Sequence, residues 1–170
     1  MTDSFAVRMA TPSDIPTIAQ HRARMFHDMG ELPASVHEQL FDATIAYLRT
    51  AIPTGEYVGW LAAPADRPDE IVAGAGVQLR RVLPHPRRLE NGELSLAVGK
   101  QAIVLNVFTE TPWRRRGLAE QLMAHLLDWV RRNNVETLVL HASDQARGLY
   151  ERLGFIPTNE MRFVGGSKRS

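Results

Sequence analysis

Cysteine is absent from this 170-residue sequence, and so is any strong excess of one charge. Without thiols, the protein can form no disulfide bond, no thiolate metal site and no cysteine nucleophile. Lysine and arginine number 20 against 19 aspartate and glutamate residues, which leaves a net charge of +1. This near balance argues against bulk attraction to nucleic acid or to a membrane surface, so we expect neither as a partner.

Long hydrophobic runs are also missing. No apolar stretch is long enough to span a bilayer, and the start Met1-Thr2-Asp3-Ser4 has neither the charged region nor the hydrophobic region of a secretory signal. We therefore expect a cytoplasmic protein. The length, with 44% hydrophobic and 23% charged residues, is typical of one globular domain, which we predict over residues 1–170 with a flexible tail at about 165–170.

Apolar spacing and turn residues predict an alternation of strands and helices. Helices are expected where apolar residues recur every three or four positions, and strands where they alternate or run together between turn residues. The predicted strands are 5–9, 56–62, 70–79, 103–108, 137–140 and 155–164, and the predicted helices are 13–29, 34–50, about 114–132 and 143–154. Residues 81–99, rich in proline, glycine and charge, are expected to form a long loop. The last strand contains Pro157 and is expected at a sheet edge, where a homodimer could pair.

The segment from Asn106 to Ala119 carries the first functional pattern. It has the form of a strand followed by a basic turn that opens a helix. The first amides of a helix lack internal partners and lie at the positive end of its dipole, so they can bind phosphate. Gly117 removes a side chain where a diphosphate would approach, and Arg114–Arg116 supply forked donors. Taken alone, the pattern is also compatible with a solvated basic turn in which Gly117 is merely tolerated.

A second pattern lies between Ser143 and Phe155, after the apolar run 137–140 that predicts a buried strand. Ser143 is a good N-cap for a short helix. Ser143, Ala146 and Tyr150 are spaced i, i+3 and i+7, so they share one helix face. A hydroxyl, a small residue and a phenol therefore follow one side of this helix.

Together the two patterns resemble the GNAT superfamily of acyl-CoA-dependent N-acyltransferases. Arg114-Arg115-Arg116-Gly117-Leu118-Ala119 is similar to the family's Gln/Arg-x-x-Gly-x-Gly/Ala pyrophosphate loop, and Ala146-x-x-Leu149-Tyr150-x-x-x-Gly154-Phe155 is similar to its C-terminal signature. The motifs occur in the family's order, and residues 101–156 carry the resemblance. It implies an α+β fold: a central mixed, mostly antiparallel sheet of six to seven strands, flanked by about four helices, whose fourth and fifth strands splay apart.

The resemblance also implies that acetyl-CoA is the cosubstrate and that an amine on a small molecule or peptide is the acceptor. Backbone groups of Val107, Phe108 and Thr109 would pair with the pantetheine arm and polarise the thioester carbonyl. Tyr150 matches the tyrosine proposed as general acid in the family, although a core tyrosine is the alternative. Ser143 stands where the family often has an asparagine that touches the cofactor arm. The residues implied to hold the diphosphate are Arg114, Arg115, Arg116, Gly117, Leu118, Ala119 and Glu120.

The general base is left open by the sequence. Some family members carry a glutamate early in the fourth strand, but the matching position here is close to Ile103. Glu110 and His141 are candidate bases, with a solvated carboxylate and a structurally satisfied histidine as the alternatives. A water relay needs neither. His21 and His27 do not share a helix face, so we expect no metal site.

Three functions follow from these patterns. The favoured one is an N-acetyltransferase that moves an acetyl group from acetyl-CoA to a primary amine by direct transfer in a ternary complex. The alternative is a non-catalytic acyl-CoA sensor, suggested by the missing glutamate in the fourth strand. A nucleic-acid-binding domain that uses Arg114–Arg116 is poorly supported by the near-zero net charge. No motif in the first two helices or in residues 81–99 identifies the acceptor.

Overall fold

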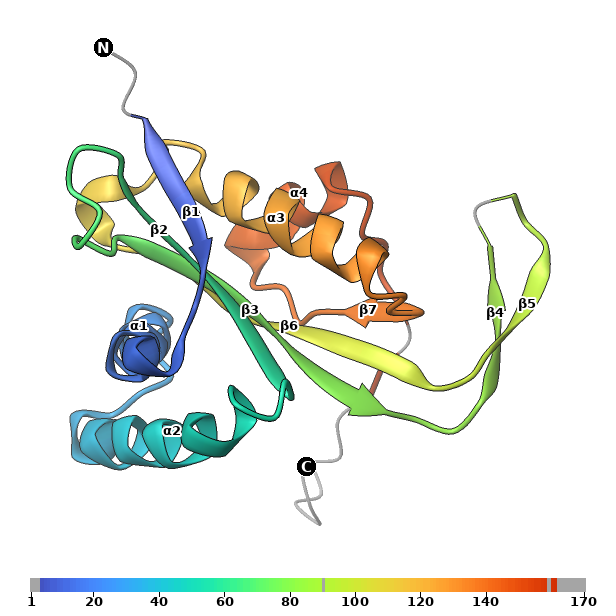
Figure 1. Cartoon of the computed structure of the whole chain (residues 1–170), viewed down its shortest axis with the longest axis horizontal. Helices are drawn as coiled ribbons and strands as arrows, with labels where there is room; N and C mark the ends of the chain where they lie inside the picture. Colours follow the sequence, from blue (N-terminus) through green and yellow to red (C-terminus); the bar gives the residue numbers. More distant parts are fainter. Residues whose placement is uncertain (1–3, 90, 159, 162–170) are drawn as a thin grey trace, which may run out of the picture. The chain divides into compact units, whose positions relative to one another are not determined.

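The structure, a computed structural model, describes residues 4–89, 91–158 and 160–161 (Figure 1). Two compact units make up the chain, Met1–Leu140 and His141–Ser170, and they are described separately below. The expected single domain over residues 1–170 stays a prediction, and the expected flexible tail at 165–170 lies outside the described residues.

A five-stranded sheet forms the centre of the first unit (Figure 1). Its strand order is β1-β2-β3-β6-β7, in which every neighbouring pair is antiparallel except β6 and β7. The strands are β1 (Phe5–Met9), β2 (Tyr57–Pro64), β3 (Ala73–Arg81), β6 (Lys100–Thr109) and β7 (Thr137–Val139). A separate two-stranded sheet contains β4 (His85–Arg88) and β5 (Leu94–Ala97).

Helices cover both faces of the five-stranded sheet, and two successive residues of β2 show how. Leu61 packs in a core cluster with Ile18 of α1 (Ile15–Asp28) and Leu48 of α2 (His37–Ala51). Its neighbour Trp60 makes an edge-on ring contact with Trp129 of α3 (Leu118–Arg132), at 5.8 Å between centroids. Because successive strand residues point to opposite faces, α1 and α2 lie on one face and α3 on the other, as Figure 1 shows.

The apolar residues that predicted α3 explain its packing. Leu118, Leu122 and Leu126 recur at helical spacing, and all three are buried in the structure. Arg131 and Arg132 lie in the last turn, where positive charge complements the helix dipole. Short 3-10 turns precede each of the first three helices, at Pro12–Asp14, Ala34–Val36 and Thr111–Trp113. No helix in the described part of the chain combines the length and apolar character that a membrane crossing requires.

The second unit contains α4 (Asp144–Arg152), the predicted fourth helix. Tyr150 of this helix meets Phe155 edge-on, with ring centroids 5.9 Å apart. The predicted strand over 155–164 is not found where it can be checked: residues 155–158 and 160–161 form no strand, and 159 and 162–164 lie outside the described residues. The dimer pairing that depended on this strand stays a prediction.

The predicted α+β class and the mostly antiparallel sheet with four helices are confirmed. Two details differ. The seven described strands are divided between sheets of five and two, and the expected long loop over 81–99 contains the hairpin β4–β5. Pro86 is compatible with this hairpin because both strands of a two-stranded sheet are edge strands. On an edge strand, proline is tolerated where its missing N–H would face away from the partner strand. Gly92 supplies the positive φ of +85° in the turn.

Candidate functional site

An open strand edge is the first feature of the candidate site. β7 pairs with β6 only from Gln101 to Ile103, where Ile103 faces Val139. β6 continues to Thr109, and among the described strands the only partner of residues 104–109 is β3, which pairs with Val104, Leu105, Phe108 and Thr109. The backbone groups of these residues that face away from β3 therefore lack a strand partner, which is the separation of β6 from β7 that the resemblance implied. Val107, Phe108 and Thr109 all belong to this segment.

A bulge in β6 lies directly before those residues. Asn106 has a φ of +58°, and the β3–β6 register shifts between Gly74 and Gly76. The buried Asn106 side chain holds this conformation: its Nδ2 donates to the Tyr57 hydroxyl at 3.1 Å, and its Oδ1 accepts from Arg22 Nη1 at 2.6 Å. Glycine at 76 is required for this arrangement because a Cβ there would overlap the Tyr57 ring and hydroxyl.

The start of α3 is the second feature. Gly117 is the N-cap residue, with a φ of +78° that glycine adopts without strain, and no side chain caps the helix. The first backbone bond into this turn runs from Gln121 to the Gly117 carbonyl, at 3.0 Å. Within the described residues, the amides of Leu118, Ala119 and Glu120 donate to no backbone or side-chain acceptor. No atom of the described residues lies within 4 Å of the position that a Gly117 Cβ would occupy, and helix amides without partners can bind an anion.

The three arginines of the loop have different surroundings. Arg114 donates from Nε to the Thr109 carbonyl at 2.9 Å and bonds to Asp28 at the end of α1, so its side chain braces the loop against β6 and α1. Arg116 donates to the Pro112 carbonyl and stacks over Trp113 at 4.8 Å. Arg115 has a φ of +63° and forms no hydrogen bond or ion pair with any other described residue. Its guanidinium is therefore available to a ligand.

Glu110, a candidate base, lies just after β6 in a polar cluster with two residues of α1. Its Oε1 accepts from Arg24 and lies 3.6 Å from His21 Nε2. His21 is 4% exposed, and burial lowers its pKa to about 4, because the opposing effect of Glu110 is smaller. His21 Nδ1 has no hydrogen-bond partner among the described residues. The imidazole is therefore neutral at pH 7.

In the second unit, Tyr150 is 8% exposed, and burial raises its pKa. A phenol with a raised pKa keeps its proton at neutral pH, which a general acid requires. Ser143 is the N-cap residue of α4, but its hydroxyl makes no capping bond. His141, the other candidate base, is exposed and its Nε2 lies 2.7 Å from Glu160 Oε1. That contact can orient the ring.

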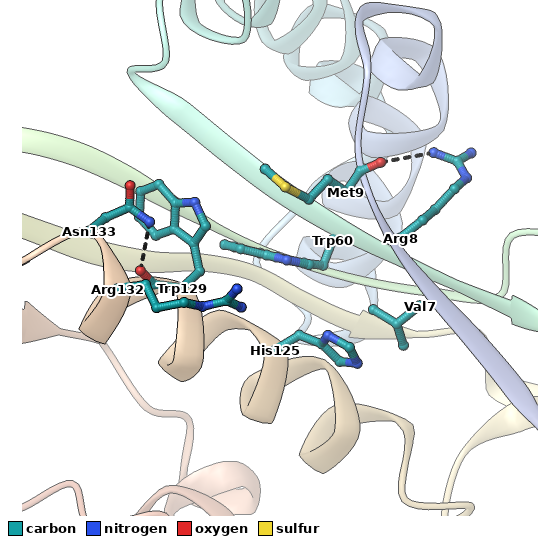
Figure 2. Close-up of a pocket in the computed structure, with 8 residues that line it drawn as sticks. All are labelled: Val7, Arg8, Met9, Trp60, His125, Trp129, Arg132 and Asn133. Carbon is teal, nitrogen blue, oxygen red and sulfur yellow. Dashed lines mark hydrogen bonds between the residues drawn. The ribbon is translucent and has the colours of Figure 1, made fainter.

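Sequence reasoning did not identify the Arg22–Asn106–Tyr57 network. The available signal was an asparagine within an otherwise apolar strand, Ile103-Val104-Leu105-Asn106-Val107-Phe108. The groove in Figure 2 lies elsewhere in the first unit, between β1 and the C-terminal half of α3. It contains none of the predicted site residues. The residues that line it are Val7, Arg8, Met9, Trp60, His125, Trp129, Arg132 and Asn133.

Comparison with known proteins relates part of the sequence to a family profile and nearly all of the fold to solved structures. A family profile described as an acetyltransferase (GNAT) domain matches residues 95–168. This range includes the open part of β6, the α3 loop and α4. No curated protein matches the sequence significantly.

Solved structures match nearly the whole chain. A GCN5-related N-acetyltransferase from Ralstonia eutropha JMP134 is 25% identical, with a TM-score of 0.80 over 96% of this chain and 100% of that one. A predicted acetyltransferase from Clostridium acetobutylicum, solved with acetyl-CoA, is 21% identical, with a TM-score of 0.75 over 95% and 96%. Glucosamine-6-phosphate N-acetyltransferase from Arabidopsis thaliana is 15% identical, with a TM-score of 0.62 over 98% and 100%. The profile match to a GNAT acetyltransferase domain covers the C-terminal residues, and the similarity of fold to acetyltransferases extends over nearly the whole chain.

Proposed function

We propose that the protein transfers an acetyl group from acetyl-CoA to a primary amine, directly and within a ternary complex. The observation that carries this proposal is the combination of an open β6 edge with the uncapped start of α3, which follows it along the chain. A thioester arm bearing amides can extend a strand edge, and a diphosphate suits helix amides at the positive end of a dipole. The C. acetobutylicum protein of the same fold, solved with acetyl-CoA, supports this choice of cosubstrate.

Each part of the site has a role in this proposal. Val107, Phe108 and Thr109 offer main-chain groups to the pantetheine arm, and the Phe108 side chain is buried against His21, so only its backbone takes part. Amides of Gly117 to Glu120 receive the diphosphate, with Arg115 and Arg116 adding charge. Arg114 acts by holding the loop in position through Asp28 and Thr109.

The transfer step follows from the pKa values of the reacting groups. An alkyl ammonium has a pKa of about 10.4, so the acceptor must lose a proton before its nitrogen can attack the carbonyl. The new C–N bond forms as the C–S bond breaks, and the leaving thiolate takes a proton. Tyr150, whose pKa is raised by burial, donates that proton in this proposal. Glu110, His141 or a water chain accepts the proton from the amine.

Replacing Tyr150 by phenylalanine tests the role of the phenol. Removal of a general acid costs about 10²–10⁴-fold in rate, so we expect thiol release to slow by about 100-fold or more. Because the ring still packs on Phe155, coenzyme A affinity by calorimetry and the melting temperature should stay at the wild-type values. A wild-type kcat in Tyr150→Phe would assign proton donation to another group.

A second candidate function is acyl-CoA sensing without turnover. The observation that favours it is the apolar residue Ile103, which lies close to the position of the family's strand glutamate and is 8% exposed. Both functions require coenzyme A to bind, and only the enzyme releases thiol when amines are supplied. Calorimetric titration followed by thiol release with a panel of amines distinguishes the two, and an absence of binding would reject both.

A further inference from the structure

Arg22 of α1 differs from its charged neighbours because it has no carboxylate partner among the described residues. Three other arginines of the first unit are paired with carboxylates: Arg24 with Glu110, Arg114 with Asp28, and Arg8 with Asp14. Arg22 is only partly exposed, and burial lowers its pKa. A partly buried charge without a counter-ion is unfavourable unless another group compensates it.

Aromatic side chains lie close to the Arg22 guanidinium. Its guanidinium lies 4.9 Å from the centre of the Phe26 ring and is close enough to the Tyr47 and Tyr57 hydroxyls to affect their pKa values. Tyr57 is buried, whereas Tyr47 is 40% exposed. The carboxylate in this region, Glu56, accepts hydrogen bonds from Tyr47 and Gln78 rather than from Arg22.

The position of Arg22 relates it to the open edge of β6. Among the described residues, its one hydrogen-bond partner is Asn106, which directly precedes Val107, the first residue that we assign to the thioester arm. Cα atoms of successive residues are about 3.8 Å apart. Arg22 is therefore held next to the strand segment to which we assign the thioester arm. Arginine carries five N–H donors in a planar fork that suits carboxylate and phosphate oxygens, and Asn106 uses one nitrogen.

We propose that Arg22 binds an anionic group, a carboxylate or a phosphate, on the acceptor amine. This inference rests on the proposed acetyl transfer and narrows its acceptors to amines that also carry a negative charge. The aromatic walls formed by Phe26 and Tyr47 would pack on the carbon skeleton between the two groups.

Matched amine pairs test the inference and separate the two anions. Phenylalanine is compared with 2-phenylethylamine for the carboxylate, and O-phosphoethanolamine with ethanolamine for the phosphate. We expect kcat/KM for thiol release to favour the anionic member of at least one pair by about tenfold or more, since charge-assisted hydrogen bonds are the strong ones. Equal values within both pairs would overturn the inference.

Three variants test whether Arg22 causes the preference for the anionic amine of a pair. Arg22→Met should abolish this preference. Arg22→Lys keeps the charge but loses the planar set of donors, so it should retain only part of the preference. Arg49→Met removes an exposed arginine from α2 and should preserve the wild-type ratio. A ratio unchanged in Arg22→Met would assign selectivity to another residue and refute the inference.

A binding measurement keeps the test independent of turnover and of variant folding. In wild-type protein, the Nε–Hε resonance of Arg22 is followed by NMR during titration with N-acetyl-L-phenylalanine, with N-acetyl-2-phenylethylamine as the neutral control, and with inorganic phosphate. We expect a saturable shift with an anion and none with the neutral amide. No shift with either anion overturns the Arg22 inference even if acetyl transfer occurs. Absence of coenzyme A binding, with the Arg22 shift intact, counts instead against the proposed function.

Discussion

At the scale of single residues, Gly117 is where backbone conformation and the proposed phosphate site coincide. An L-residue at its φ of +78° is strained by about 1–2 kcal/mol, but a Cβ would meet nothing within 4 Å. We expect Gly117→Ala to lose about that much stability and to weaken coenzyme A binding, since the methyl group enters the space before the amides. Gly55→Ala is the matched control, with a φ of +73° and equally open surroundings. It should lose similar stability in denaturant unfolding and retain wild-type affinity; equal affinity in both variants would contradict the phosphate assignment.

The sequence allowed some of these residues to be predicted and not others. Gly117 and the arginines before it are contiguous, so local pattern was sufficient to identify a possible anion site. Arg22 and Asn106 lie 84 positions apart, and no local rule brings them together. The positive φ of Asn106 could not be predicted from the sequence either, because the bulge depends on which residues of β3 lie opposite. Interactions that depend on tertiary pairing require the fold.

At the scale of elements, the join between β1 and α1 depends on an ion pair. Arg8 donates to both oxygens of Asp14 at 2.8 Å, and Thr11 completes a capping box. These bonds lower the pKa of Asp14 from 3.8 to about 2, and the hydrogen bond from Arg8 has the largest effect. Since the folded pKa lies below the unfolded one, the stabilisation is complete above pH 4 and is lost as pH falls towards 2.

Asp14→Asn should cost about 1–2 kcal/mol of stability at pH 7, and this deficit relative to the wild type should shrink below pH 4. Urea unfolding checks this against exposed Asp42→Asn, whose expected cost is near zero; a deficit that persists at pH 2 would contradict the ion-pair explanation.

Element positions followed from sequence where the apolar period was long and regular, as in α3. The hairpin β4–β5 was missed because prolines and charges in residues 81–99 dominate a pattern with few buried positions. Leu94 and Leu96 are 68% and 65% exposed, so the alternation of this strand contributes little to a core and gives a weak signal. The separation of β6 from β7 came from family resemblance, since apolar periodicity does not predict where a ladder ends.

At the scale of the whole molecule, the fold positions the site by packing α1 against the end of β6. His21 lies at this junction. Its ring centroid is 5.1 Å from that of Phe108, and the charged residues Glu110 and Arg24 lie near it. Burial of an imidazole this deep makes stability depend on pH. Its folded pKa of about 4 lies below its unfolded value of 6.5, so protonation favours the unfolded chain.

This linkage predicts a specific loss of stability between pH 6.5 and 4. The contribution of neutral His21 is present above pH 6.5, declines as pH falls, and amounts to about 2–3 kcal/mol over the window. His21→Leu removes the titrating group while keeping an apolar side chain of similar size. We expect the free energy of unfolding of the wild type to fall more steeply than that of the variant by this amount, measured with urea at several pH values. His27→Leu, which replaces an exposed histidine six residues further along α1, should keep the wild-type slope. Parallel curves for wild type and His21→Leu would contradict this linkage, because they would mean that the folded chain accepts a proton at His21 without loss of stability.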